Sequence, residues 1–159
     1  MLKELLKEKK LSIVDSWTQS VFETYQLEAT KFFKLQKNQF SNPVGNIVSV
    51  NIEKIFDEMI NDNNIGKIKS SLNDIVKIRA VQDFSPSQAI GFIYSLKKII
   101  NKELRQEIKD EKTIDELMTI ESGIDNIALA GFDLYMEARE KIFQIRIKEI
   151  KSKSLAIEG

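Results

Sequence analysis

The most informative segment of the chain is Ile75-Val-Lys-Ile-Arg-Ala-Val-Gln-Asp-Phe-Ser-Pro-Ser-Gln-Ala89. The first half of this segment has apolar residues at helical spacing. The second half is typical of a helix start. Ser85 can accept a hydrogen bond from a free backbone N–H, Pro86 suits the first helical position, and Gln88 can complete a capping box. The segment therefore predicts two helices that meet at a defined corner.

Polar side chains are concentrated at this corner, where Arg79, Gln82 and Asp83 stand among apolar residues. In a functional interpretation they bind a small anion or switch between two arrangements. In a structural interpretation Arg79 pairs with an acidic group and braces the corner, while Asp83 contacts nearby backbone, because buried charges need partners. The residue types alone leave both interpretations open.

Apolar residues spaced three and four apart continue on both sides of the corner, and no segment has the alternation of a strand or hairpin. We therefore predict an all-α fold of about six or seven helices. The expected helices cover residues 2–9, 12–37 with a break near 21–25, 43–60, 65–83, 86–109, and 114 to beyond 150. A capping box of Thr113 and Glu116 is expected to begin the last helix.

Two other places on these helices are candidates for function. Asn42 precedes a proline, which excludes the helical region for it, so Asn42 and Pro43 suit the cap and first residue of a helix. Alternatively, they shape the entrance of a pocket. Trp17 lies on an apolar helical stripe, where it either packs in the core or contacts a ligand or a partner.

The composition is that of one globular domain. A length of 159 residues with 42% hydrophobic and 30% charged residues suits a single folded unit, expected over residues 1–150, with residues 151–159 as a frayed tail. The 24 basic and 24 acidic residues leave no net charge, which argues against broad binding to nucleic acid.

The chain has neither histidine nor cysteine, which excludes several kinds of site. Disulfides, zinc sites, Ser-His-Asp triads and histidine-bound haem cannot be built without them. Glu121 and Asp125 have the i,i+4 spacing of helical di-metal sites, but those sites also recruit histidines. We therefore expect no metal, no cofactor and no catalysis, and treat Tyr25, Tyr94 and Tyr135 as packing residues rather than haem ligands.

The N-terminus, residues 1–10, alternates charges and lacks the long apolar centre of a secretory signal. No run of about 18 apolar residues is present to span a membrane. A cytoplasmic location is therefore expected. The last helix has a heptad-like apolar stripe, which favours packing within the bundle or pairing with a second copy as a homodimer.

Three segments together resemble one known family. They are Phe40-Ser-Asn-Pro-Val-Gly45, the corner at residues 75–89, and Leu96-Lys-Lys-Ile-Ile100. They are similar to the RsbRD N-terminal domain family, the sensory domain of bacterial RsbT co-antagonist proteins and of some histidine kinases. Trp17 also falls where that domain usually has a tryptophan, and the resemblance covers about residues 11–104.

This resemblance implies a helical signal-input domain. Related stressosome input domains resemble globins without haem and pair as dimers. Full-length relatives continue into a STAS or kinase output domain, whereas this sequence has none, so we expect a stand-alone module that acts through a partner regulatory protein or a small-molecule ligand. Arg79, Gln82 and Asp83, with Asn42 nearby, are the expected centre of its response, and the last helix is expected to transmit it. The alternatives are a purely structural helical adaptor and, less in keeping with the residues, an enzyme.

Overall fold

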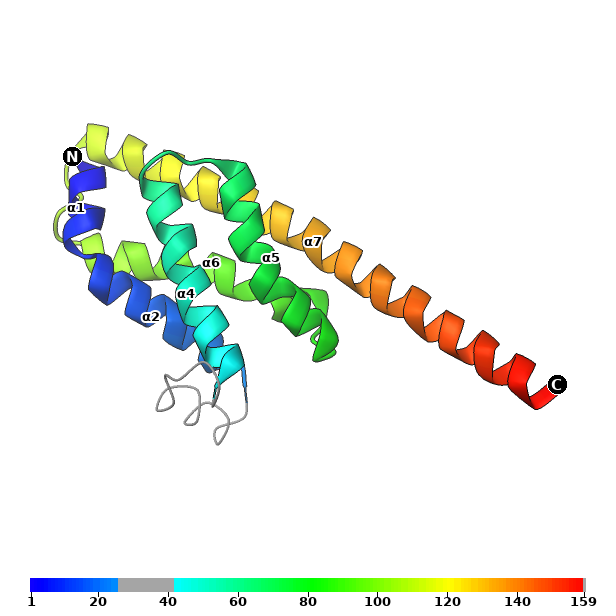
Figure 1. Ribbon diagram of the computed structural model, residues 1–159. Coiled ribbons are helices and arrows are strands. Elements are labelled where there is room, and N and C mark those ends of the chain that lie inside the picture. The colour runs from blue at the N-terminus through cyan, green and yellow to red at the C-terminus, as the bar shows by residue number, and fades with distance from the viewer. Residues whose placement is uncertain (26–41, 159) are drawn as a thin grey trace.

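Six helices and no strand make up the described part of the chain, residues 1–25 and 42–158 of the computed structural model (Figure 1). In chain order they are α1 (Leu2–Glu8), α2 (Lys10–Phe22), α4 (Pro43–Ile60), α5 (Ile65–Val81), α6 (Pro86–Leu104) and α7 (Glu111–Glu158). The predicted all-α fold with a long C-terminal helix is confirmed. Its arrangement is consistent with the globin-like fold that the family resemblance implies.

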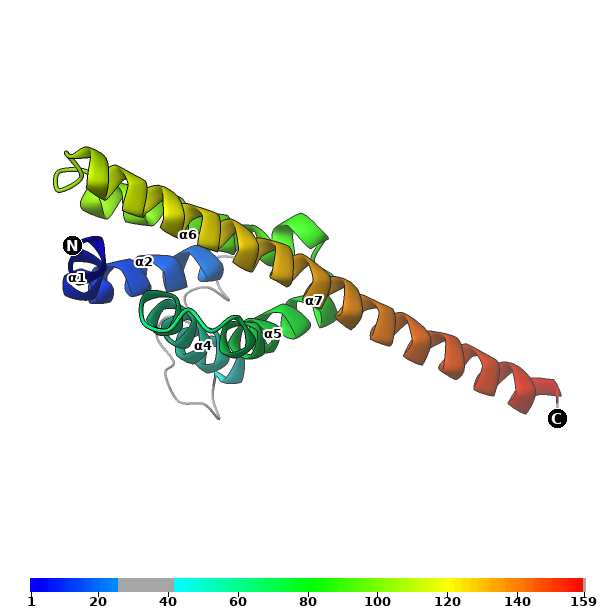
Figure 2. The ribbon, with the colours of Figure 1, turned by 90° about the horizontal axis from the view of Figure 1, so that it is seen from above.

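The helices form two antiparallel pairs that enclose one core. α4 lies beside α5, and α6 lies beside the first half of α7 (Figures 1 and 2). α5 also packs against α7, and α2 packs against both α4 and α6. Each helix turns an apolar stripe inwards, and the side chains that the stripes bury most completely include Leu6, Ile13, Trp17, Ile52, Ile55, Phe56, Ile68, Leu72, Val76, Ile93 and Ile124.

A glycine lets α7 approach α6 closely. A Cβ atom on Gly131 would lie 2.9 Å from Cδ1 of Ile93, closer than packed carbon atoms allow. Gly123, eight residues earlier on an open face, would have no atom within 4 Å of an added Cβ. Neither glycine interrupts the helix, which is continuous from Glu111 to Glu158.

The second half of α7 leaves the bundle and projects away from the other helices (Figures 1 and 2). The apolar stripe that the sequence predicts for this helix includes Ile142 and Ile145. Ile142 is half-buried against the bundle, whereas Ile145 is exposed. Residues 151–158, which were expected to fray, continue the same helix.

Two helices end several residues before their predicted last residue, whereas α1 and α5 end within two residues of theirs. α2 ends at Phe22, at the expected break, and the rest of the predicted helix over 12–37 lies outside the described residues from 26 onward. α6 ends at Leu104 rather than near Lys109, and a turn follows in which the N–H groups of Glu107 and Ile108 both donate to the Leu104 carbonyl.

The predicted capping box at Thr113 is wrong. Asp110 supplies the cap instead: its Oδ1 accepts from the Thr113 backbone N–H at 2.7 Å, so α7 begins at Glu111. A carboxylate is a strong N-cap and also favours the positive end of the helix dipole, which explains the earlier start. Within the described residues, none of the helices has the length and apolar character needed to cross a bilayer.

Candidate functional site

The corner between α5 and α6 is fixed by local hydrogen bonds. The predicted capping box is present: the Gln88 N–H donates to Ser85 Oγ at 3.3 Å, and the Ser85 N–H donates to Gln88 Oε1 at 3.0 Å. Asp83 precedes it with a φ of 60°, in the left-handed region that aspartate tolerates better than most residues. The corner is therefore a specific backbone turn.

Arg79 lies beneath this corner with no exposed surface. Its Nη1 donates to the Gln88 carbonyl at 2.8 Å. Its Nη2 donates to the Val21 carbonyl at 3.2 Å and to Thr24 Oγ1 at 2.8 Å. One guanidinium thus joins the last turn of α5, the end of α2 and the start of α6.

Aromatic rings surround the same guanidinium. Its Cζ lies 4.8 Å from the ring centre of Phe84, 5.3 Å from that of Phe92 and 5.5 Å from that of Tyr25. Ring faces attract cations, which offsets part of the cost of burying this charge. We call Arg79 and these three rings the arginine cage.

The arginine cage has no carboxylate within the described part of the chain, and Arg79 Nε has no hydrogen-bond partner there. Arg79 does brace the corner, as the structural interpretation predicted, but it uses carbonyls, a hydroxyl and rings in place of an acid. Burial lowers the pKa of Arg79, and the nearby Tyr25 opposes that effect. A buried cation without an anion is costly, and such groups are more frequent at functional sites than elsewhere.

Gln82 and Trp17 lie at the edges of the arginine cage. Gln82 Oε1 accepts from the Tyr25 hydroxyl at 3.0 Å, which holds one ring of the cage to the end of α5. Burial raises the pKa of Tyr25, while the Arg79 charge and this hydrogen bond act in the other direction. Trp17 is buried, and its Nε1 donates to the Phe92 carbonyl at 2.8 Å, so it supports the cage from behind.

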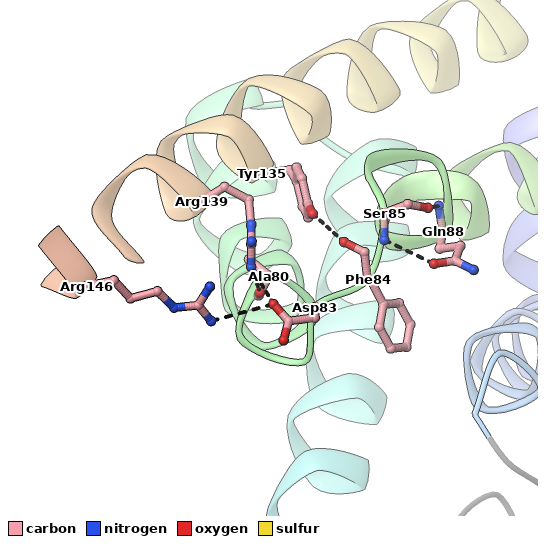
Figure 3. A network of polar contacts seen from close by, with 8 residues as sticks. All are labelled: Ala80, Asp83, Phe84, Ser85, Gln88, Tyr135, Arg139 and Arg146. Carbon is pink, nitrogen blue, oxygen red and sulfur yellow. Dashed lines mark hydrogen bonds and ion pairs between the residues drawn. The ribbon is translucent and has the colours of Figure 1, made fainter. Parts of the chain in front are cut away.

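Asp83 connects the corner to α7 (Figure 3). Its Oδ1 lies 2.9 Å from Nη1 of Arg139 and 3.7 Å from Nη2 of Arg146. Arg139 Nη1 also donates to the Ala80 carbonyl at 2.8 Å, which closes the C-terminal end of α5. Asp83 therefore contacts side chains of a distant helix, whereas the structural interpretation placed it against nearby backbone.

Phe84 makes a second connection to α7. Its carbonyl accepts a hydrogen bond from the Tyr135 hydroxyl (Figure 3), while its ring lies against Arg79. The arginine cage and α7 therefore share one residue.

A comparison with known protein families identifies the family of this chain. A model of the RsbT co-antagonist protein RsbRD N-terminal domain matches residues 12–150. The chain belongs to this family. No curated protein and no solved structure matches it significantly. The family is one of sensory and regulatory domains, so the arginine cage and its connections to α7 belong to a signalling domain.

The remaining predicted positions of this RsbRD N-terminal domain, Asn42 and Pro43, lie at the start of α4. Asn42 is buried and caps α4, its Oδ1 accepting from the Gly45 N–H at 2.9 Å, and Pro43 is the first residue of that helix. The helix-start interpretation accounts for both residues. The contacts described for them do not join them to Arg79.

The acidic pair on α7, Glu121 and Asp125, binds side chains of α6. Glu121 Oε1 accepts from Asn101 Nδ2 at 2.9 Å, and Asp125 lies 2.6 Å from Lys97 Nζ. No group of three acidic side chains suited to a metal ion lies within the described residues. These carboxylates attach α7 to α6.

Sequence reasoning missed the residues of α7 that contact the corner: Tyr135, Arg139 and Arg146. Their spacing of four and seven residues placed them on one side of the helix. Nothing in the sequence paired that side with a corner more than 50 positions earlier.

Proposed function

We propose that this domain is a non-catalytic signal-input module in which the arginine cage responds to a small-molecule ligand or a partner protein. The observation that supports this proposal best is the continuous path from the buried Arg79, through Phe84, to Tyr135 on α7. The family is regulatory, and a chain without histidine or cysteine lacks the commonest catalytic groups.

The arginine cage has the properties of an element with two arrangements. Arg79 is held by neutral acceptors, and its Nε is unpartnered among the described residues. A competing anion offers this cation a stronger, charge-assisted partner. An anion that draws the guanidinium from Gln88 or Thr24 loosens the contact of α5 with α6 and α2.

In the proposed mechanism α7 carries the change away from the cage. Phe84 and Asp83 move with the corner, and they contact Tyr135 and Arg139 on α7. The projecting half of the helix amplifies a small rotation at the bundle into a larger displacement at its end. A ligand shifts this equilibrium only if it binds the two arrangements with different affinity.

Spin labels test this path, because the chain has no cysteine of its own. Labels on Lys67→Cys of α5 and Lys148→Cys of α7, both exposed positions, report the direction of α7 relative to the bundle. We expect Arg79→Lys, which loses the fork of hydrogen bonds, to shift or broaden the distance distribution. The control is Ile55→Val, an equally buried change on α4. Unchanged distances with unchanged ligand and partner binding would contradict the proposal.

Native mass spectrometry of the unlabelled protein tests what the module binds. A reproducible added mass that Arg79→Lys removes would support ligand sensing. The same spectrum tests the homodimer that the family resemblance implies, which stays a prediction.

The exposed apolar residues of α7 favour a second candidate function, a structural adaptor that assembles a larger complex without sensing a signal. Phe143 and Ile150 are 64% and 67% exposed, which is unusual for large apolar side chains that have no partner. An adaptor would bind its partner with the same affinity in the wild-type and Arg79→Lys proteins.

A further inference from the structure

α7 carries an exposed apolar row with a seven-residue repeat, which begins within the bundle and continues along the projecting half of the helix. Its members are Leu129, Met136, Phe143, Ile150 and Ile157, with exposed fractions of 63%, 49%, 64%, 67% and 85%. A seven-residue repeat places apolar side chains along one seam of a helix, and that seam is the usual contact with another helix. The row extends beyond the bundle (Figure 1), where no described helix covers it.

A basic row runs beside the apolar row. Arg139, Arg146 and Lys153 each follow a member of the apolar row by three residues, so they line one flank of the seam. Residues 141–157 contain five basic residues and one acidic residue, a net charge of +4 in a chain that is neutral overall. Over the longer range 136–157 there are six basic and three acidic residues, a net charge of +3, so the seam carries an excess of positive charge.

The surface is also hollowed where α7 leaves the bundle. A hollow of about 600 Å³ is lined by Asp133, Met136, Glu137, Arg139, Glu140 and Phe143. It contains Met136 and Phe143 of the apolar row, so an apolar side chain of a partner can enter it. Its polar lining has three carboxylates and one guanidinium, so the positive charge of this surface lies beyond the hollow, at Arg146 and Lys153.

A second copy of the chain fits this seam poorly. In a parallel coiled coil with the apolar row at the d positions, Glu140 occupies an a position and would face Glu140 of the other copy. Arg146, at a g position, would face Lys151 at an e position of the other copy. In an antiparallel pair the two basic rows would lie opposite each other. Both arrangements place like charges together, which destabilises helix pairs.

A bilayer surface also fits poorly, because it requires one broad apolar face. The other exposed apolar residues here include Ile145 and Leu155, which helical spacing places away from the row and on the side of Lys141 and Lys148.

We propose that residues 136–157 of α7 are the docking surface for an amphipathic helix of a partner protein whose flanks are acidic. The partner helix packs its own apolar row on Phe143 and Ile150, and its carboxylates face Arg146 and Lys153. This inference rests on the proposed function in one respect: it identifies the kind of partner that receives the movement of α7.

Arg146 links this docking surface to the corner. Its Nη2 lies 3.7 Å from Asp83 Oδ1, a contact long enough to be exchanged for a closer carboxylate. A docked acidic helix draws Arg146 away from Asp83 and leaves Asp83 to Arg139 alone. Docking and the state of the corner are therefore coupled in both directions.

The test uses two synthetic three-heptad peptides as probes, with leucine on the apolar row and either glutamate or lysine on both flanks. Fluorescence anisotropy at about 0.15 M salt measures their binding to the whole chain. We expect the glutamate peptide to bind at least about tenfold more tightly. Arg146→Glu with Lys153→Glu should reverse the preference. Lys69→Glu with Lys98→Glu, exposed positions away from the seam with the same charge change, should retain it.

Three outcomes would overturn the inference. The two peptides bind equally, or the chain self-associates in a manner that Ile150→Asp abolishes, or phosphatidylglycerol vesicles bind through Arg146 and Lys153 in preference to the glutamate peptide. Circular dichroism confirms that each variant keeps its helices. Peptide binding needs no movement of the arginine cage, so its failure leaves the spin-label result at Arg79 intact, and the reverse also holds.

Discussion

The guanidinium carbon of Arg79 lies 4.8 Å from the ring centre of Phe84. The ring belongs to the corner between α5 and α6, and the carbonyl of the same residue accepts a hydrogen bond from Tyr135 of α7. Phe84 therefore contacts the buried cation with its ring and α7 with its carbonyl. In the mechanism that we propose, this residue is one of the two routes by which a change at the arginine cage reaches α7.

Removing the Tyr135 hydroxyl should weaken this connection without creating a cavity. Tyr135→Phe leaves the Phe84 carbonyl without its donor, and we expect a loss of about 1 kcal/mol in the free energy of unfolding. Urea denaturation measures it. Tyr94→Phe is the control, since Tyr94 is 46% exposed, and it should change stability by only a few tenths of a kcal/mol. Equal effects of the two changes would contradict the connection.

The stability of variants at Asp83 should depend more on whether the new residue tolerates a positive φ than on whether it keeps the negative charge. Asp83→Asn keeps a side chain suited to the φ of 60°, and it loses exposed ion pairs worth about 0–1 kcal/mol. Asp83→Val adds a β-branched side chain that is strained at positive φ, so it should cost at least about 1 kcal/mol more. Thermal unfolding compares the two variants. If Asp83→Val were as stable as Asp83→Asn, the corner would not depend on this conformation.

The two helix caps that use asparagine should differ in strength because one is buried. Asn42→Ala removes the bond to the Gly45 N–H in a place that water does not reach, so we expect a loss of about 1–2 kcal/mol. Asn64→Ala removes an exposed cap of α5, where water can replace the bond to the Lys67 N–H, and should cost less. Guanidinium denaturation of both variants checks the order.

The two glycines of α7 should respond in opposite directions. Gly123→Ala improves helix propensity and meets no atom, so it should stabilise the domain by about 0.5–1 kcal/mol. Gly131→Val forces a Cβ against Ile93 and should destabilise it by about 1–3 kcal/mol. The melting temperatures of the two variants measure both effects. A stable Gly131→Val protein would mean that the δ-methyl group of Ile93 turns aside at little cost.

The start of α7 should loosen in acid. Hydrogen bonds from the Thr113 side chain, and then from its backbone N–H, hold the pKa of Asp110 below its usual range. Because the folded-state pKa is lowered, the cap stabilises the helix above the ordinary aspartate pKa of about 3.9 and is lost as the pH falls below it. The protection factor of the Thr113 amide, which compares its exchange with the intrinsic rate at the same pH, should therefore fall below about pH 4. In Asp110→Asn the side chain caps the helix but does not titrate, so the protection factor of the Thr113 amide should not change over this pH range.

Features that depend on neighbours in the sequence were predictable. The capping box of Ser85 and Gln88 spans three positions, and the helical stripes repeat every three or four residues, so their physical causes lie within one turn of a helix. The family followed from ordered motifs in the same way. Thr113 is the exception, because two adjacent capping signals competed and the carboxylate of Asp110 was stronger.

The sequence by itself determined the helices, the corner and the place of Arg79 at that corner. Only the tertiary structure decided what Arg79 and Asp83 contact. Arg79 reaches Val21, 58 positions earlier, and Asp83 reaches Arg139, 56 positions later. The physical reason is that a buried cation can be satisfied by a carboxylate, by carbonyls or by aromatic rings. Which of these it meets depends on how distant helices pack, and helical periodicity carries no information about that choice.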